Sequence, residues 1–346
     1  MNILPVNADS IALGAEIIVR GGLVAFPTET VYGLGADALN PGALARIFEA
    51  KGRPRFDPLI IHIAAVESLE NAADLSRLDR ETRRILDILT LRLWPGPLTL
   101  VLPKQPWVPG LATSGLPTAA VRFPAHPAAQ ELIRHSTGVV AAPSANPFGY
   151  LSPTRAEHVR AQLGDKADLI LDGGRTPVGV ESTVLDLSAG PPRILRPGGV
   201  SRERIEALIG PVGLPNAPGD GGVPAPLAPG QLKSHYAPRT PLSVYPQEVM
   251  ASLKFSPHEG YLFFDAPSRD AWLAGQQDRL ASRAFSSAAI QTLSFEGNLR
   301  EAAANLFDLL HLLDGLGLSH IRAELAPPPG LGPAINDRLM KAAARI

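Results

Sequence analysis

Three cationic side chains, Lys51, Arg53 and Arg55, stand at alternate positions in the segment "KGRPR". Arginine grips two phosphate oxygens through parallel hydrogen bonds, whereas lysine supplies a mobile point charge. The spacing therefore favours a clamp for a polyanion. The plainer alternative is the general preference of helix C-termini for cations, an effect of roughly 0.3–1 kcal/mol.

A second set of polar residues lies where apolar segments end. Arg122 closes "AAVRF", and a buried arginine needs an anion, a role that a substrate carboxylate would fill. Ser144 and Asn146 follow "VVAA", and ligands of open α/β sheets gather beyond the carboxyl ends of strands. An ordinary Asx or Ser turn explains either residue alone. His62, inside "LIIHIA", is by itself typical of a hydrogen-bonded core histidine.

The segment "FPTETVYGLGADA", residues 26–38, carries more polar groups than a turn requires, since one glycine or asparagine would suffice. Further along, "SPT" at 152–154 suits a helix start, whose free amides favour anions. Ser182 and Arg196 stand in "GVESTVLD" and "ILRPGG". Together these loops predict one cavity for a polyphosphate and a small zwitterion. The chain has neither a GxxxxGK[ST] loop nor a GxGxxG after its first strand, so ATP would have to be bound by a different arrangement of loops.

The composition and charge of the chain exclude several classes of function. The chain has 346 residues, enough for two domains, with 32 basic and 33 acidic side chains. This balance argues against capture of nucleic acid or an anionic membrane by the protein as a whole. The chain has no cysteine, which excludes disulfides and thiolate chemistry, and its histidines lack HExxH spacing, so no permanent metal is expected. The first twenty residues lack signal-peptide features, and the chain is predicted to be cytoplasmic.

Apolar periodicity alternates between helical and strand patterns along the first 210 residues. The predicted helices lie at 11–19, 41–51, 80–93, 127–135, 154–163 and 202–209. The predicted strands lie at 23–26, 58–64, 98–102, 119–123, 139–142, 168–171, 182–187 and 193–195. This order predicts an α/β domain with a twisted, mixed sheet.

Residues 211–230 contain six prolines and five glycines, a composition typical of an extended linker. Strand patterns at 242–245, 260–264 and 320–325, with helical patterns near 296–314 and 333–345, follow it. The predicted organisation is therefore an α/β domain at 1–210, a linker or lid at 211–238, and a smaller Rossmann-like α/β domain at 239–346.

The ordered motifs resemble the YrdC-like threonylcarbamoyl-AMP synthases in their long, two-domain form. The first domain carries "FPTETVYGLGADA", "AKGRPRFDPLIIHI", "WPGPLTLVL", "AVRFPAHP", "AAPSANPFG", "LSPT", "LDGG", "GVESTVLD" and "ILRPGG". "APGQLKSHYAP" and "GLGPAINDRLMKAA" resemble the markers of the long form. The likeness runs from about Gly21 to the C-terminus, and between Pro241 and Leu325 it is one of pattern only.

The resemblance implies a nucleotidyltransferase that condenses L-threonine, bicarbonate or CO2, and ATP into L-threonylcarbamoyl-AMP and pyrophosphate. The product feeds N6-threonylcarbamoyladenosine formation in tRNA, through downstream transferase proteins. Magnesium is expected to arrive on the ATP phosphates, with no permanent cofactor; a contact with RNA is left open.

The family's site residues carry over to matching positions. The implied catalytic tetrad is Lys51, Arg53, Ser144 and Asn146. The implied threonine-binding residues are Thr28, His62, Arg122, Ala142 (through its backbone) and Ser182. The implied ATP-binding residues are Lys51, Arg55, Thr113, Ser144, Ser152 and Arg196, with His235 and Tyr236 closing over the site from the linker.

Two other function classes remain as alternatives. An RNA-binding module is disfavoured by the neutral charge and by an aromatic content of 5%. A carbamoyl-phosphate-dependent transferase with the same domain would carry acylphosphatase and zinc-finger segments; neither is visible, and the lack of cysteine excludes the latter.

Overall fold

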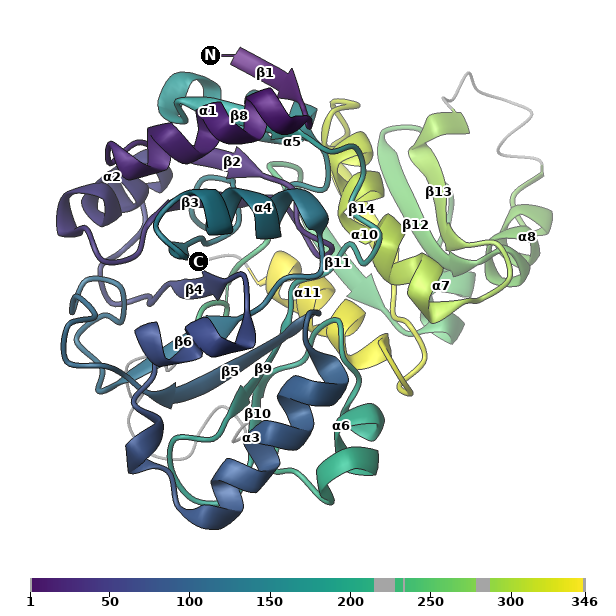
Figure 1. The fold of residues 1–346 in the computed structure, drawn as a ribbon. Helices are drawn as coiled ribbons and strands as arrows, with labels where there is room; N and C mark the ends of the chain where they lie inside the picture. The colour runs from purple at the N-terminus through teal and green to yellow at the C-terminus, as the bar shows by residue number, and fades with distance from the viewer. Residues whose placement is uncertain (1, 215–227, 233, 278–286, 345–346) are drawn as a thin grey trace. The chain divides into compact units, whose positions relative to one another are not determined.

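The fold is described from a computed structural model, which covers residues 2–214, 228–232, 234–277 and 287–344 (Figure 1). Contacts divide the chain into two compact units. The first comprises residues 1–148, 152–177 and 181–232, and the second comprises 149–151, 178–180 and 233–346. The division after Leu232 falls inside the range predicted as a linker, of which 215–227 and 233 lie outside the described residues.

The first unit is built on one ten-stranded mixed sheet. In spatial order its strands are β1 (Asn2–Pro5), β8 (Leu169–Asp172), β2 (Val24–Phe26), β3 (Gly33–Asp37), β7 (Val139–Ala141), β4 (Ile60–Ile63), β6 (Thr118–Arg122), β5 (Leu98–Pro103), β9 (Thr183–Asp186) and β10 (Arg193–Arg196). The sheet contains both parallel pairs, such as β4 with β6, and antiparallel pairs, such as β5 with β6. The predicted mixed α/β sheet is confirmed.

Among the residues that the structure describes, six α-helices of the first unit lie close to the predicted places, and their ends follow from local sequence. They are α1 (Ala8–Val19), α2 (Pro41–Lys51), α3 (Arg80–Leu93), α4 (Pro127–His135), α5 (Ala156–Leu163) and α6 (Arg202–Ile209). The Asn40 side chain caps α2 by accepting from the Gly42 and Ala43 amides, and Gly52 ends it in the left-handed conformation with φ 60°. Short 3-10 helices lie at Val66–Asn71, Leu75–Arg77 and Gly164–Lys166.

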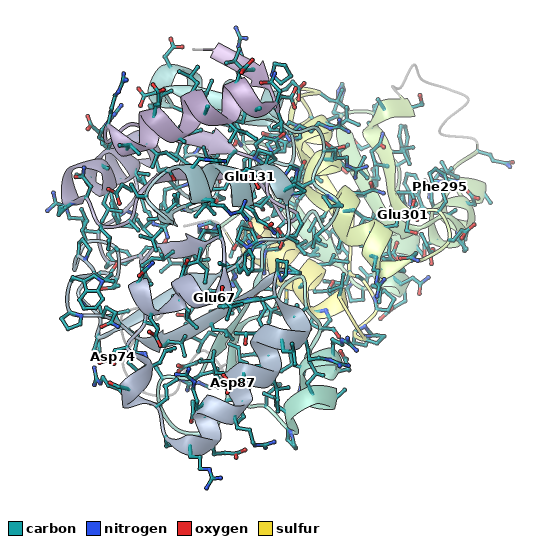
Figure 2. All side chains as sticks on the ribbon, in the orientation of Figure 1. Glu67, Asp74, Asp87, Glu131, Phe295 and Glu301 are labelled. Atoms are coloured by element: carbon teal, nitrogen blue, oxygen red, sulfur yellow. The ribbon has the colours of Figure 1, made fainter. Side chains whose placement is uncertain are left out.

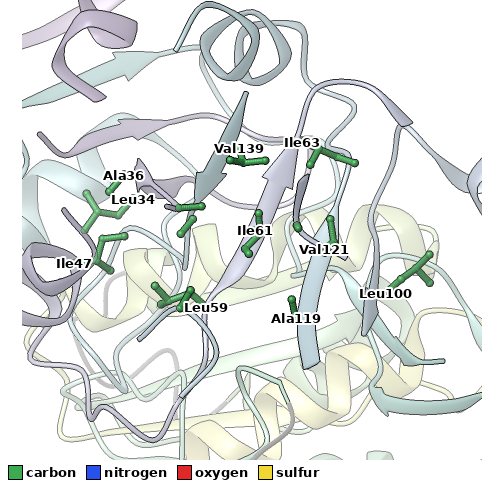
Figure 3. Packing of buried hydrophobic residues seen from close by; sticks show 14 of the residues in the cluster. Leu34, Ala36, Ile47, Leu59, Ile61, Ile63, Leu100, Ala119, Val121 and Val139 are labelled. Carbon is green, nitrogen blue, oxygen red and sulfur yellow. The ribbon is translucent and has the colours of Figure 1, made fainter. Parts of the chain in front are cut away.

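The two faces of the sheet bury different residues. On one face Ile61, Leu100 and Val121 join the largest hydrophobic cluster, together with Ile47 of α2 (Figure 3). On the other face, α1 and α4 cover a second cluster that includes Val140 of β7. Because side chains alternate along a strand, the residues between those of the first cluster must face the second side.

Part of the segment 26–38 forms a strand that was not predicted. Gly33–Asp37 forms strand β3, although its sequence was expected to belong to one of the loops around the predicted cavity. A Cβ at Gly35 would lie 2.6 Å from a ring carbon of Phe26 and 2.9 Å from Val140. Glycine is therefore required at position 35 by packing within the sheet. Strand β1 was also missed.

The second unit contains a four-stranded parallel sheet in the order β11 (Leu242–Tyr245), β14 (His320–Glu324), β12 (Glu259–Asp265) and β13 (Ile290–Ser294). Its helices are α7 (Gln247–Ser252), α8 (Ala266–Ala274), α10 (Leu299–Asp314) and α11 (Gly332–Ala343), with a 3-10 turn at Ser287–Ala289. The expected strands and two longer helices are confirmed. Strand β13 and helices α7 and α8 were not predicted: β13 begins with half-buried residues, α7 has only six residues, and α8 buries only Ser268 and Trp272, so its apolar periodicity is weak.

Candidate active site

One face of the central strands carries the predicted polar residues. His62 of β4 and Thr99 of β5 both stand in register with Arg122 of β6, so the three share a face. Ile60, Val101 and Ala120 lie two residues away on the same strands and form a small apolar cluster on that face. The register therefore brings together side chains that are up to 60 residues apart.

Arg122 is buried, with 4% of its surface exposed, and is held on three sides. Its Nη1 donates to Thr30 Oγ1 at 2.9 Å, and its Nε donates to the Gly96 carbonyl at 3.3 Å. Its Nη2 forms an ion pair with Glu29 Oε1 at 2.7 Å. The anion that Arg122 requires is thus supplied in part by the protein itself, from the "PTET" turn.

The Thr28 hydroxyl organises that turn. It donates to the Val31 carbonyl at 2.7 Å, so in its 2.8 Å contact with Thr30 the Thr30 hydroxyl is the donor. The Thr30 amide also donates to Thr28 Oγ1, at 3.1 Å. Hydrogen bonds therefore run in one direction from Arg122 through Thr30 to Thr28. The Thr28 hydroxyl is occupied by these contacts, and its role in threonine binding stays a prediction.

His62 is an uncharged residue of this face. Burial lowers its pKa to about 3, and the positive charge of Arg122 acts in the same direction. Its Nδ1 lies 3.2 Å from the Ile60 carbonyl, and its ring meets the Phe26 ring edge-on at 6.4 Å between centroids. A neutral imidazole offers hydrogen bonds to a ligand and adds no charge.

Lys51 ends α2 and reaches the loop that follows β7. Its Nζ donates to the Ser144 carbonyl at 2.6 Å and closely to the Asn146 carbonyl. Burial lowers the pKa of Lys51 well below its usual value; Arg53 lowers it further, and Asp57 opposes the shift. The predicted tetrad is thus brought together by tertiary structure at the end of α2.

Arg53 is neutralised by its own loop. Its Nη2 lies 2.9 Å from Asp57 Oδ2, and it donates to the Asp57 and Pro58 carbonyls at 3.0 and 2.7 Å. Burial raises the pKa of Asp57, while the charges of Arg53, Lys51 and Arg196 act to lower it. Lys51, Arg53 and Arg196 are therefore near enough to one buried carboxylate to influence its charge.

Ser182 and Arg196 form a further group at the start of β9. The Thr99 and Ser182 hydroxyls lie 2.7 Å apart, and Arg196 Nη2 donates to the Ser182 carbonyl at 2.8 Å. Arg196 Nη1 donates to the Pro229 carbonyl at 3.0 Å, and the neighbouring Ala228 is fully buried in the apolar cluster of Ile60 and Val101. Ala228 and Pro229 thus lie against the same sheet face.

The remaining predicted residues lie at several other places in the first unit. The Ala142 amide donates to the Ile60 carbonyl at 2.9 Å, so that amide is already used within the sheet. Thr113 is buried and follows Ala112, whose carbonyl accepts from the Leu59 amide. Ser152 is buried and donates to Glu181, and Arg55 is exposed.

His235 and Tyr236 belong to the second unit. The His235 amide donates to the Lys341 carbonyl at 3.2 Å. Tyr236 has a left-handed φ of 62°, and its ring lies 5.0 Å from the Arg338 guanidinium carbon and 5.7 Å from the Phe307 ring. Their predicted closure over the site stays a prediction.

Among the buried carboxylates that were not assigned from the sequence, Glu29, Asp57 and Glu181 contact candidate site residues. Glu29 and Asp57 are 7% and 0% exposed, in contrast to exposed carboxylates such as Glu67 and Asp87 (Figure 2). The available signal was weak: each is a lone acidic residue inside a segment of candidate site residues. Thr30 and Thr99 were missed likewise, because only the tertiary contacts give them partners.

An open hollow of about 860 Å³ lies elsewhere in the first unit, along α1 and α4. Ile11, Ala15 and Val19 line it with Glu131, which is labelled in Figure 2. None of the predicted site residues line this hollow, so the single cavity predicted from the sequence stays a prediction.

The described residues contain no group of three or more His, Asp or Glu side chains arranged to hold a metal ion. Within the same residues, no helix has the length and apolarity that crossing a bilayer demands. What the site offers is a set of fixed cations, hydroxyl groups and a neutral histidine, which suits recognition of anions and stabilisation of developing negative charge.

Comparison with known proteins accounts for nearly the whole chain. Residues 16–198 match the Sua5/YciO/YrdC family model, described as telomere recombination, and residues 200–344 match the model of the threonylcarbamoyl-AMP synthase C-terminal domain. The threonylcarbamoyl-AMP synthase of Pyrococcus abyssi is 43% identical over 332 residues, covering 96% of this chain and 93% of the relative. That of Bacillus subtilis is 40% identical over 344 residues, covering 98% and 94%. The crystal structure of P. abyssi Sua5 complexed with L-threonine has a TM-score of 0.83 at 40% identity, covering 99% of this chain and 97% of that one.

Proposed function

The chain belongs to the Sua5/YciO/YrdC family, and we propose that it is a threonylcarbamoyl-AMP synthase. The observation that carries the proposal is the 40–43% identity, over nearly the full length, to relatives that bear this name. The reaction joins L-threonine, bicarbonate or CO2, and ATP, and releases pyrophosphate. Its class is that of a nucleotidyltransferase, because an adenylyl group moves to a carbamate.

The buried cations fit the electrostatic demand of this reaction. The threonine amine and bicarbonate form a carbamate with loss of water. A carbamate oxygen then bonds to the α-phosphorus of ATP as the bond to pyrophosphate breaks. One anion attacks another, so fixed positive charge and positioning supply most of the acceleration. Lys51, Arg53 and Arg196 would face the phosphates, and Arg122 would receive the threonine carboxylate. Magnesium would travel with ATP, held by phosphate oxygens and water.

The product would serve the modification of tRNA to N6-threonylcarbamoyladenosine. A downstream transferase would take the threonylcarbamoyl group, since the adenylate is a mixed anhydride that water also cleaves. Because the acceptor is tRNA, we place the reaction in the cytoplasm.

The end of the linker is suited to keep water from that adenylate. Ala228 packs in the apolar cluster of the site face, and Arg196 holds the Pro229 carbonyl. Ala228→Asp should weaken this contact and lower the amount of adenylate recovered per pyrophosphate released. Ala207→Asp, at an exposed position of α6, is the matched control. Equal recovery in both variants would leave the linker as a passive tether.

The activity is tested by pyrophosphate release from ATP, omitting threonine and bicarbonate in turn. Release that persists without threonine would contradict the proposal. Lys51→Ala should reduce turnover far more than it lowers the thermal midpoint, whereas Arg160→Ala, at an exposed site, should change neither. Arg53→Ala alone would leave Asp57 buried without its cation, at a cost of about 3–5 kcal/mol. Arg53→Gln combined with Asp57→Asn tests the clamp while retaining a neutral pair.

A further inference from the structure

We infer that Glu29 is a positioning residue for amino-acid recognition: it holds the Arg122 guanidinium in the orientation that receives the substrate carboxylate. This inference rests on the proposed function and deepens it, because it concerns how the amino-acid half of the site is built.

Glu29 connects two turns that are far apart in the sequence. Its Oε1 lies 2.7 Å from Arg122 Nη2, and its Oε2 accepts a hydrogen bond from the Ala125 amide at 3.0 Å. One carboxylate thus fixes both the guanidinium that ends β6 and the backbone three residues beyond it. The side chains of Glu29 and Arg122 are 9% and 4% exposed.

Burial makes this arrangement unlike an exposed surface pair. Desolvating a carboxylate and a guanidinium costs several kcal/mol per ion, and the attraction between them only repays it when the geometry is good. The same fold encloses apolar residues on both sides of the sheet, where an apolar pair would be at least as stable. A functional constraint on Arg122 accounts for the retention of both charges.

The partners of Arg122 leave it able to bind a further anion. Arginine has five N–H donors: Nε donates to Gly96 and Nη1 to Thr30, whereas Nη2 faces Glu29 as an ion pair without a hydrogen bond. Both terminal nitrogens therefore keep a second N–H for a carboxylate, which matches a planar guanidinium in a bidentate manner. The contacts with Gly96, Thr30 and Glu29 fix the plane of the guanidinium, and with it the orientation of the remaining N–H groups, before substrate arrives.

Removing the charge of Glu29 should affect threonine and ATP differently. Glu29→Gln keeps the shape and an acceptor for the Ala125 amide but loses the ion pair with Arg122. We expect the KM for threonine to rise about 10- to 100-fold, as loss of one charge-assisted contact would produce, while the KM for ATP stays within about threefold. Glu29→Asp should recover part of the threonine affinity. Glu67→Gln, at an exposed position of the same unit, is the matched control.

Serine adds a readout that a general loosening of the site would not give. Serine and threonine share the carboxylate, so Glu29→Gln should leave the ratio of their kcat/KM values unchanged. The inference is overturned if the threonine KM of Glu29→Gln stays within twofold of the unaltered chain. It is also overturned if the KM values for threonine and ATP rise by the same factor along with a fall in Tm, which would mark a structural role. Absence of threonine-dependent pyrophosphate release in the unaltered chain would instead refute the proposed function.

Discussion

Substituting Gly198 by alanine should separate two loops of the site. An added Cβ would lie 2.3 Å from the Ser182 carbonyl carbon, 2.4 Å from the Glu181 oxygen and 2.4 Å from the Thr183 nitrogen. Ordinary contacts begin at 3.4 Å, so backbone must move by about 1 Å, because no flexible side chain is available to yield. Such overpacking costs about 1–3 kcal/mol.

The shift should damage function more than stability. For a unit of this size, 1–3 kcal/mol lowers Tm by roughly 2–12 °C. Ser182 would lose its 2.7 Å contact with Thr99 and its 2.8 Å contact with Arg196, and a misplacement of this order can reduce turnover about 10²-fold. Thermal denaturation and pyrophosphate release measure the two effects.

A matched control isolates the role of the close contact. At Gly110 an added Cβ meets nothing within 4 Å, and its φ is not positive. Gly110→Ala should therefore leave Tm and turnover unchanged. If Gly198→Ala also kept the original Tm and turned over within twofold of the unaltered chain, the packing of these loops as described here would be refuted.

Three further perturbations test charge and hydrogen bonding. Burial lowers the pKa of His62 to about 3, so between about pH 3 and 6.5 the unfolded chain binds more protons at this position than the folded protein does. The free energy of unfolding should therefore rise with pH in this range, by up to about 1.4 kcal/mol per pH unit. His62→Gln should reduce that slope in urea denaturation. Because burial lowers the pKa of Lys51, its ammonium loses its proton at a lower pH than that of an exposed lysine; ATP affinity should therefore fall as pH rises, and Lys51→Met should flatten that dependence in titrations of ATP binding. Tyr32→Phe removes the hydroxyl that bonds to backbone at 173–174, and should cost about 1–3 kcal/mol in chemical denaturation.

Local sequence determined most helices and several strands of this protein. The helix α2 shows why: Asn40 caps its start, Pro41 suits its first turn, and Gly52 adopts the left-handed end that other residues resist. These effects act over a few residues, so they are readable without tertiary structure. The same holds for the motif order that identified the family.

Strand β3 could not be predicted from its local sequence. Its sequence, "GLGAD", has the low strand propensity of a loop, yet it pairs with β2 and β7 because glycine admits the Phe26 and Val140 side chains. The pairing energy comes from neighbours that are distant in the sequence.

The sequence identified the candidate site residues, but it did not predict which side chains they contact. Arg122 was expected to await a substrate anion, and only the fold revealed that Glu29, 93 residues earlier, already holds it. The ion pair of Asp57 with Arg53 and the packing of Ala228 on the sheet face were likewise apparent only from the fold. Sequence fixes which groups are available, whereas burial and strand register decide which of them meet, because both depend on the packing of the whole chain.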